Sequence, residues 1–329
     1  MFSAERRATP ILARFTSVDG RTVRYFDAGT GRPGQPLVVL LTAAADTSLS
    51  WLPVQSELMD RARVLTYDRT GMGGTEDGAP RTLDGYVAEL AGFLRSVAPR
   101  SRFVLVGHSF GGLIARVYAK RFPKKVAGLV LLDVTPEVVG GDRAAAGGFA
   151  VSSALVGALR RLAPTGLLHG LLQSALMPLY PEQRRLRAEL DADAYEAWKR
   201  AVELEIRGNA VEELRSVLPV AREAAAELGA DEPLGDLPVA VLTSNAYGRR
   251  WRDLHDDIAA RYPGSTHEAT GTRSHNIHLR HVPQVAQTVR AVLAASGRRR
   301  RPPAAPRDSA TRAAQGSPVS QTPPVAPAD

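Results

Sequence analysis

A single serine stands between glycines where an apolar stretch of the sequence gives way to a helical pattern. The segment "GHSFG" at 107–111 follows the apolar run 103–106 and precedes a helix expected over 111–122. A serine hydroxyl becomes a nucleophile when a base takes its proton and N–H donors stabilise the oxyanion that forms. A sharp strand-to-helix turn exposes such a hydroxyl, and flanking glycines leave room for the turn. The segment therefore predicts that Ser109 attacks an acyl carbonyl.

The segments on either side of this serine follow a known order. "YDRTGMGGTED" at 67–77 precedes a helical pattern, and the apolar "AGLVLLDVTP" at 127–136 follows the serine. Together with the glycine-framed serine, these segments resemble the α/β-hydrolase fold superfamily over residues 12–296. The resemblance implies a capped, esterase-like serine hydrolase whose triad occurs in the chain order serine, acid, histidine.

This resemblance places the general base on a loop after the last strand. Five histidines lie late enough in the chain, namely His255, His267, His275, His278 and His281. His255 falls on an expected helix and His267 in the expected last strand, whereas His275 falls on the loop before the final helix. We therefore assign His275 as the base, with His278 as the second candidate.

The acidic partner of the base departs from the usual pattern of the superfamily. Most relatives carry the acid after the seventh strand, but "VAVLTSNAYGRRWRD" at 239–253 holds no carboxylate before Asp253. Asn245 in that segment offers only an uncharged partner. Asp133 ends the sixth strand, and the carboxyl end of a parallel strand lies at the catalytic edge of the sheet. Asp133 is therefore the first choice, ahead of Asp253.

The oxyanion donors follow from the same resemblance. Phe110, the residue after the serine, supplies one backbone N–H. In relatives the second N–H comes from the loop after the third strand, where they carry His-Gly. This chain carries Thr42-Ala43 at that place, so Ala44 is the expected donor. We expect Ala43 and His108 to contact the substrate.

Three other patterns suggest chemistry that we reject or regard as structural. The steps of three from His275 to His281 drift around a helix and have no carboxylate close in sequence, which argues against a metal site. The segment "GTGRPG" at 29–34 satisfies G-x-G-x-x-G but lies between two expected strands and opens no helix. Asp68 and Arg69 are expected to brace the neighbouring glycine-rich loop. We expect neither a metal nor another cofactor.

Short apolar, β-branched runs alternate with helical patterns along the chain, which predicts an α/β fold with a mostly parallel sheet and helices on both faces. A hairpin is expected where Asp19-Gly20 joins two runs, and Thr82 is the expected N-cap of a helix. Strands are expected at 14–18, 22–29, 36–43, 62–68, 102–108, 126–134, 237–245 and 265–270, and helices at 83–98, 111–122, 250–262 and 282–296.

The pattern changes over 140–232, which holds no good strand and includes a helical segment at 193–208. We predict a helical cap at 140–235, inserted between core segments at 1–139 and 236–296. The first part of this cap is rich in Leu and Ala and lacks acids, which predicts an apolar pocket beneath a lid.

Composition narrows the classes of protein further. The 329 residues include no cysteine, which excludes disulfides, thiolate metal sites and a cysteine nucleophile. The net charge of +8 is partly due to a Pro-rich tail at 297–329, which holds six arginines and two aspartates and which we expect to be disordered. No aromatic residues accompany these arginines, so we expect no nucleic-acid partner. No apolar run predicts a signal peptide or a membrane span, so we expect a soluble, cytoplasmic protein.

These patterns together predict a serine hydrolase that cleaves an ester, lactone or thioester of a fairly hydrophobic small molecule through an acyl-enzyme. Relatives that open epoxides or remove halogens carry aspartate in place of the serine, which disfavours those reactions. Two alternatives stay open. The first is a non-hydrolytic cyclase or isomerase on the same scaffold, and the second is a non-catalytic protein that binds a small ligand. The sequence does not specify the substrate or the oligomeric state.

Overall fold

One mixed sheet of eight strands runs through the residues that this computed structural model describes, which are 11–162, 209–229 and 235–298. The strands are β1 (Ala13–Val18), β2 (Arg21–Ala28), β3 (Leu37–Leu41), β4 (Val64–Tyr67), β5 (Phe103–His108), β6 (Val126–Leu132), β7 (Val239–Thr243) and β8 (Thr266–Ala269). Their order across the sheet is β1-β2-β4-β3-β5-β6-β7-β8. The pairs β1–β2 and β2–β4 are antiparallel, and all other neighbours are parallel. The carboxyl ends of the parallel strands therefore meet at one edge.

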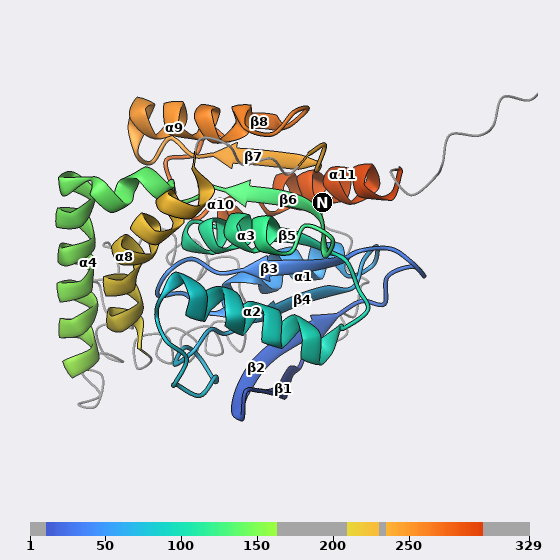
Figure 1. The fold of residues 1–329 in the computed structure, drawn as a ribbon, viewed down its shortest axis with the longest axis horizontal. Coiled ribbons are helices and arrows are strands. Elements are labelled where there is room, and N and C mark those ends of the chain that lie inside the picture. The colour runs from blue at the N-terminus through green and yellow to red at the C-terminus, as the bar shows by residue number, and fades with distance from the viewer. Residues whose placement is uncertain (1–10, 163–208, 230–234, 299–329) are drawn as a thin grey trace, which may run out of the picture.

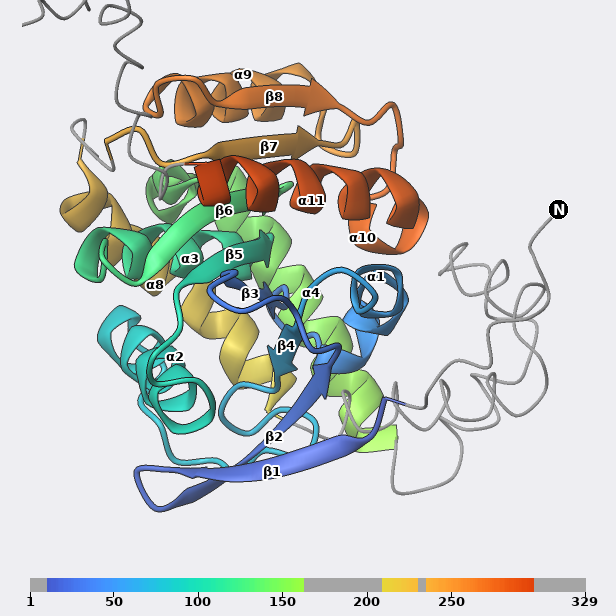
Figure 2. The ribbon, with the colours of Figure 1, turned by 90° about the vertical axis from the view of Figure 1, so that its right-hand side faces the viewer.

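Helices cover both faces of this sheet (Figures 1 and 2). The core on one face takes its side chains from α2 (Leu83–Val97), α3 (Phe110–Arg121), α8 (Ala210–Leu228) and α9 (Gly248–Ala260). The core on the other face takes them from the short helix η1 (Ser48–Trp51), α1 (Leu52–Leu58), α10 (Ile277–Arg280) and α11 (Val282–Arg298). These two cores explain the uninterrupted apolar sequence of β3. Val38 and Leu40 face one core while Val39 and Leu41 face the other.

The predicted order of strands and helices is confirmed. The hairpin turns at Asp19 and Gly20, both with positive φ, and Thr82 caps α2 by accepting a hydrogen bond from the Gly85 N–H at 3.1 Å. The sequence analysis did not predict α1 or α10. With seven and four residues, these helices are too short for a helical period of apolar residues to show.

The segment between β6 and β7 contains α4 (Arg143–Leu162) and α8, which pack against each other, preceded by the short helix η2 (Glu137–Gly141). Its described residues form helices and no strand. The helix predicted at 193–208 and most of the predicted tail lie outside the described residues, and the cap boundaries at 140 and 235 stay predictions. Among the described helices, none combines the length and apolar character needed to cross a membrane.

Candidate active site

Ser109 lies at the turn between β5 and α3. Its φ of 51° and ψ of −117° form a strained conformation for a residue with a side chain. A Cβ on Gly107 would lie 2.4 Å from the Cα of Gly112, and one on Gly111 would lie 2.5 Å from the carbonyl oxygen of Leu41. The turn therefore requires glycine on both sides of the serine, as the sequence predicts.

Asp133 follows β6 directly, and its side chain is fully buried. Its Oδ2 accepts hydrogen bonds from His275 Nδ1 at 2.8 Å and from Ser244 Oγ at 2.6 Å. Its Oδ1 accepts from the Ser244 N–H and from Trp251 Nε1, both at 3.0 Å. Burial alone would raise the pKa of Asp133, but the hydrogen bond and charge of His275 and the bonds from Ser244 hold it below the ordinary value.

This pairing fixes the tautomer of the His275 ring. An ionised carboxylate can only accept, so the proton of the neutral ring is on Nδ1 and the lone pair is on Nε2. His275 comes from the loop between β8 and α10, and its side chain is 24% exposed. Within the described residues, Nε2 of His275 has no hydrogen-bond partner, so this nitrogen can act as a general base at the edge of the sheet.

The hydroxyl of Ser109 points to a residue that the sequence analysis did not single out. Ser109 Oγ lies 3.2 Å from Thr135 Oγ1, and the Thr135 N–H donates to the carbonyl oxygen of Ser109 at 3.0 Å. Among the hydrogen bonds of the described residues, none joins Ser109 Oγ to His275. The sequence signal that could have found Thr135 is its place two residues beyond Asp133, at the same strand end.

The other predicted acids and bases lie away from this pair. Asp253 is exposed on α9, and the structure shows no bond from it to His275. His255 is fully buried between Thr243 Oγ1 at 2.6 Å and the carbonyl oxygen of Val134 at 2.8 Å, and burial lowers its pKa to about 4. Asp133 and His275 are therefore the predicted pair that the structure brings together.

The two predicted oxyanion donors are backbone groups. Phe110 is the first residue of α3, so its N–H has no acceptor within the helix. Ala44 lies in the loop after β3, and in the described part of the chain its N–H has no hydrogen-bond partner. The next residue, Ala45, has a φ of 58° and donates its N–H to Glu213 Oε2 at 2.7 Å. The loop is thus held by a side chain from α8.

Arg69 connects the same loop to α8. Its Nη1 donates to the carbonyl and hydroxyl oxygens of Thr42, both at 2.8 Å, and its Nη2 donates to the carbonyl of Ala43 at 2.5 Å. Its Nε donates to Glu213 Oε1 at 2.6 Å, and both side chains are almost fully buried. Burial would lower the pKa of Arg69, but the charge and hydrogen bonds of Glu213 raise it above the ordinary value. The guanidinium is therefore a permanent charge.

Of the two residues expected to brace the glycine-rich loop, Asp68 does so and Arg69 does not. Asp68 braces the glycine-rich loop, where it accepts from the Gly74 N–H at 3.3 Å, and it also pairs with Arg24. Arg69 instead braces the loop after β3. Its partner Glu213 is 144 positions further along the chain, so no local pattern could have shown this ion pair.

Two buried histidines lie beside His275. The rings of His108 and His278 have centroids 4.5 Å apart, and the His108 ring is also 4.6 Å from that of His275. Burial lowers the pKa of His108 well below its ordinary value and that of His278 to about 3, so both rings are neutral. His108, which we expected to contact the substrate, is fully buried, and its assignment to binding stays a prediction. His278, the second candidate for the base, is also fully buried.

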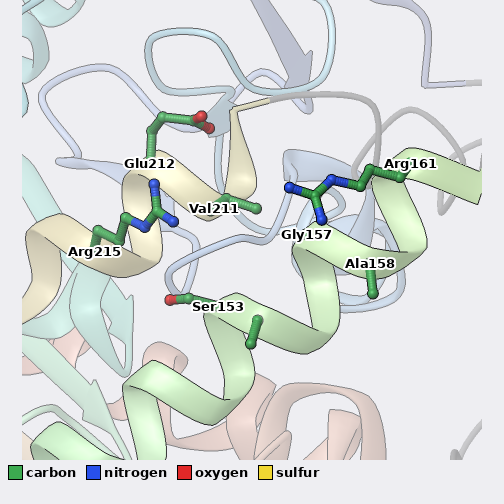
Figure 3. Close-up of a pocket in the computed structure, with 8 residues that line it drawn as sticks. Ser153, Gly157, Ala158, Arg161, Val211, Glu212 and Arg215 are labelled. Carbon is green, nitrogen blue, oxygen red and sulfur yellow. The ribbon is translucent and has the colours of Figure 1, made fainter.

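A hollow of about 540 Å³ lies between the two described helices of the predicted cap. Figure 3 shows Arg161 on α4, with Glu212 and Arg215 on α8. The remaining lining residues are Ser153, Ala154, Gly157, Ala158 and Val211. This hollow combines small and apolar residues with three charged ones, and the apolar pocket expected beneath the lid stays a prediction.

Comparison with known proteins identifies the class of fold. The family model of the alpha/beta hydrolase fold matches residues 36–156. The chain superposes on the enol-lactonase from Burkholderia xenovorans LB400 with a TM-score of 0.60 and 18% identity, covering 85% of this chain and 100% of that one. The resemblance found in the sequence is thereby confirmed, and the chain has the α/β-hydrolase fold.

Curated relatives match a smaller part of the chain. An AB hydrolase superfamily protein from Gibberella zeae is 31% identical over 110 residues, which are 32% of this chain and 34% of that protein. A 2-hydroxy-6-oxo-2,4-heptadienoate hydrolase from Pseudomonas putida is 33% identical over 126 residues, which are 37% of this chain and 44% of that protein. The chain thus matches less than half the length of these relatives.

Proposed function

We propose that this protein is a serine hydrolase in which Ser109, His275 and Asp133 form the catalytic triad. The observation that carries the proposal is the hydrogen bond between His275 Nδ1 and the buried carboxylate of Asp133, at the same sheet edge as the strained turn of Ser109. This bond leaves Nε2 of His275 as the acceptor of a proton. The hydrolase relative and the α/β-hydrolase fold support the same class of reaction.

In the proposed reaction, the hydroxyl of Ser109 rotates from Thr135 toward His275 when substrate binds. Hydrogen bonds between catalytic groups often tighten only in the complex with substrate. Ser109 Oγ then forms a bond to the acyl carbon while His275 Nε2 takes the proton, and the carbonyl oxygen becomes an oxyanion. The N–H groups of Phe110 and Ala44 stabilise that oxyanion.

Collapse of the tetrahedral intermediate expels the alcohol or thiol, which takes its proton from His275. Water then attacks the acyl-enzyme with His275 again as the base, and the acid is released with Ser109 restored. The substrate class is an ester, lactone or thioester of a small, fairly hydrophobic molecule, received under a cap formed by 140–235. This scheme uses no cofactor.

The contact between Ser109 and Thr135 favours a second candidate function. If the hydroxyl stays on Thr135 at 3.2 Å, the His275–Asp133 pair acts alone as a general base on a bound substrate. That chemistry suits the non-hydrolytic alternative, such as an isomerase or cyclase. It requires no covalent intermediate on Ser109.

A fluorophosphonate probe and a series of p-nitrophenyl esters of increasing acyl length distinguish these candidates. We expect the wild type to be labelled and to hydrolyse esters, and Ser109→Ala to lose both. Ser56→Ala, an exposed serine on α1, is the matched control and should behave as the wild type. Absence of labelling together with activity of Ser109→Ala on a substrate would refute the acyl-enzyme scheme and support the second candidate.

A further inference from the structure

Three side chains from distant parts of the chain converge beside the proposed triad. Ligand-forming atoms of Asp46, His108 and His278 all lie within 4.8 Å of one another. Asp46 comes from the loop after β3, His108 from the end of β5 and His278 from α10. Two imidazoles and one carboxylate in this proximity form a typical ligand set for a first-row transition metal.

The hydrogen bond of His108 leaves one of its two ring nitrogens with a lone pair that is available to a ligand. His108 Nε2 lies 2.9 Å from the carbonyl oxygen of His275. A carbonyl can only accept, so Nε2 carries the proton and Nδ1 of the neutral ring carries the lone pair. Among the described residues, Nδ1 of His108 has no hydrogen-bond partner although it is fully buried. A metal-binding histidine characteristically donates its other N–H to a carbonyl or carboxylate in this way.

His278 is also a fully buried imidazole with unsatisfied nitrogens. In the part of the chain that the structure describes, neither Nδ1 nor Nε2 has a hydrogen-bond partner. Its ring packs against Trp51 with centroids 4.6 Å apart. A buried polar atom without a partner costs free energy, so a fully unpaired imidazole at this position needs a reason. Coordination of a cation satisfies one nitrogen of His278 and Nδ1 of His108 together.

Asp46 supplies the carboxyl group of the cluster, and burial raises its pKa to about 7. Its Oδ1 accepts from the Thr47 N–H and its Oδ2 from Ser50 Oγ, both at 2.8 Å. Each carboxylate oxygen keeps a second lone pair after these bonds. The residue Asp46 is half-buried, whereas His108 and His278 are fully buried.

We propose that Asp46, His108 and His278 bind one divalent transition-metal ion, of the class of Zn²⁺ or Co²⁺. Imidazole ligands favour these ions over Mg²⁺ and Ca²⁺, which prefer oxygen. This site differs from the candidate metal motif of His275, His278 and His281, which the sequence analysis argued against. Only His278 is shared, and the other two ligands come from parts of the chain more than 160 residues away.

The position of the site indicates a structural role that goes beyond the proposed function. The ion would join the loop that carries Ala44, the expected oxyanion donor, to the helix that follows His275. It would thereby fix the distance between these two parts of the active site. Because three protein ligands leave at least one coordination position for water or an anion, the ion does not require a fourth side chain.

The test begins with full-length protein stripped with EDTA and titrated with Zn²⁺ and, separately, Co²⁺. We expect one ion per chain, a rise in Tm on binding, and visible Co²⁺ absorption. Asp46→Asn and His278→Phe should each weaken binding at least about tenfold. Both substitutions keep shape, and phenylalanine retains the packing on Trp51. The matched control His281→Ala alters a partly exposed histidine outside the cluster and should bind as the wild type.

Two results would overturn the proposal. One is a wild type that binds neither ion. The other is equal binding by the wild type, Asp46→Asn and His278→Phe, all folded by circular dichroism, since the ion then sits elsewhere. If a variant does not fold, hyperfine-shifted NMR resonances of the wild-type Co²⁺ protein decide, because the site predicts signals from two histidine rings. None of these measurements depends on ester turnover.

Discussion

The substitution Asp133→Asn replaces one carboxylate oxygen of a buried side chain with an NH₂ group. It tests whether the Asp133 carboxylate determines which ring nitrogen of His275 carries the proton. The amide oxygen can occupy the place of Oδ1, where it keeps the bonds from the Ser244 N–H and Trp251 Nε1. The amide NH₂ then occupies the place of Oδ2 and meets Ser244 Oγ and His275 Nδ1. Both can accept, so the number of hydrogen bonds is preserved and we expect the fold to persist.

The substitution changes the tautomer of the His275 ring, and we expect a large loss of kcat as a result. When Nδ1 accepts from the amide, the proton of the neutral ring moves to Nε2, which can no longer take a proton from Ser109. An equivalent change in serine proteases lowers kcat by about 10⁴-fold. That factor corresponds to about 5.5 kcal/mol of transition-state stabilisation. We expect a loss of this order in kcat with little change in KM.

The assay compares kcat and KM of the wild type and Asp133→Asn on the best ester of the acyl series, with Tm measured on the same samples. Asp253→Asn alters the rival acid, which is exposed on α9, and should leave both kcat and Tm nearly unchanged. A loss in kcat smaller than about tenfold for a folded Asp133→Asn would refute the tautomer argument. So would a large loss for Asp253→Asn.

Three further substitutions test the supports of the site. Glu213→Gln leaves Arg69 as a buried, uncompensated charge, so urea unfolding should show a loss of about 3 kcal/mol and ester assays a lower kcat. His255→Gln removes an imidazole whose pKa falls to about 4 on folding. The free energy of unfolding is measured against pH for both proteins. Between pH 6.5 and about 4, the wild type should lose about 1.4 kcal/mol per pH unit relative to the variant. Gly111→Ala places a Cβ 2.5 Å from the Leu41 oxygen, and urea unfolding should show a loss of about 3 kcal/mol or more.

The sign of the pH prediction follows from proton binding. Because burial depresses the pKa of His255, the unfolded chain binds the proton first as the pH falls. The wild type is therefore destabilised on the acid side. A difference in unfolding free energy between wild type and His255→Gln that does not change with pH would contradict this.

For Glu213→Gln and Gly111→Ala, the controls are Glu212→Gln, one residue away on α8, and Gly147→Ala on α4. Nothing lies within 4 Å of a Cβ at Gly147, so that change should stabilise by up to about 1 kcal/mol.

Much of the fold and part of the site were accessible from the sequence because their signals are local. Continuous apolar runs mark strands such as β3 and β6, and the glycines around Ser109 mark a turn that admits no Cβ. The edge position of Asp133 follows from the parallel order of strands. These features depend on periodicity and backbone sterics, which neighbouring residues determine.

The features that the sequence did not predict join residues far apart in the chain. Glu213 reaches Arg69 across 144 positions, and Thr135 meets Ser109 across 26. The cluster of Asp46 and the buried histidines likewise forms only when β3, β5 and α10 are placed together. Tertiary packing determines such contacts, and the spacing of residues along the chain does not predict them.

Mass spectrometry of the acyl-enzyme tests the central claim most directly. Wild-type protein mixed with an activated ester and quenched in acid within the first turnovers should gain the mass of one acyl group, and digestion should locate it on Ser109. His275→Ala and Asp133→Asn should accumulate the adduct far more slowly. Steady turnover of the ester with no acyl group on Ser109, or an acyl group on another residue, would contradict the proposed triad.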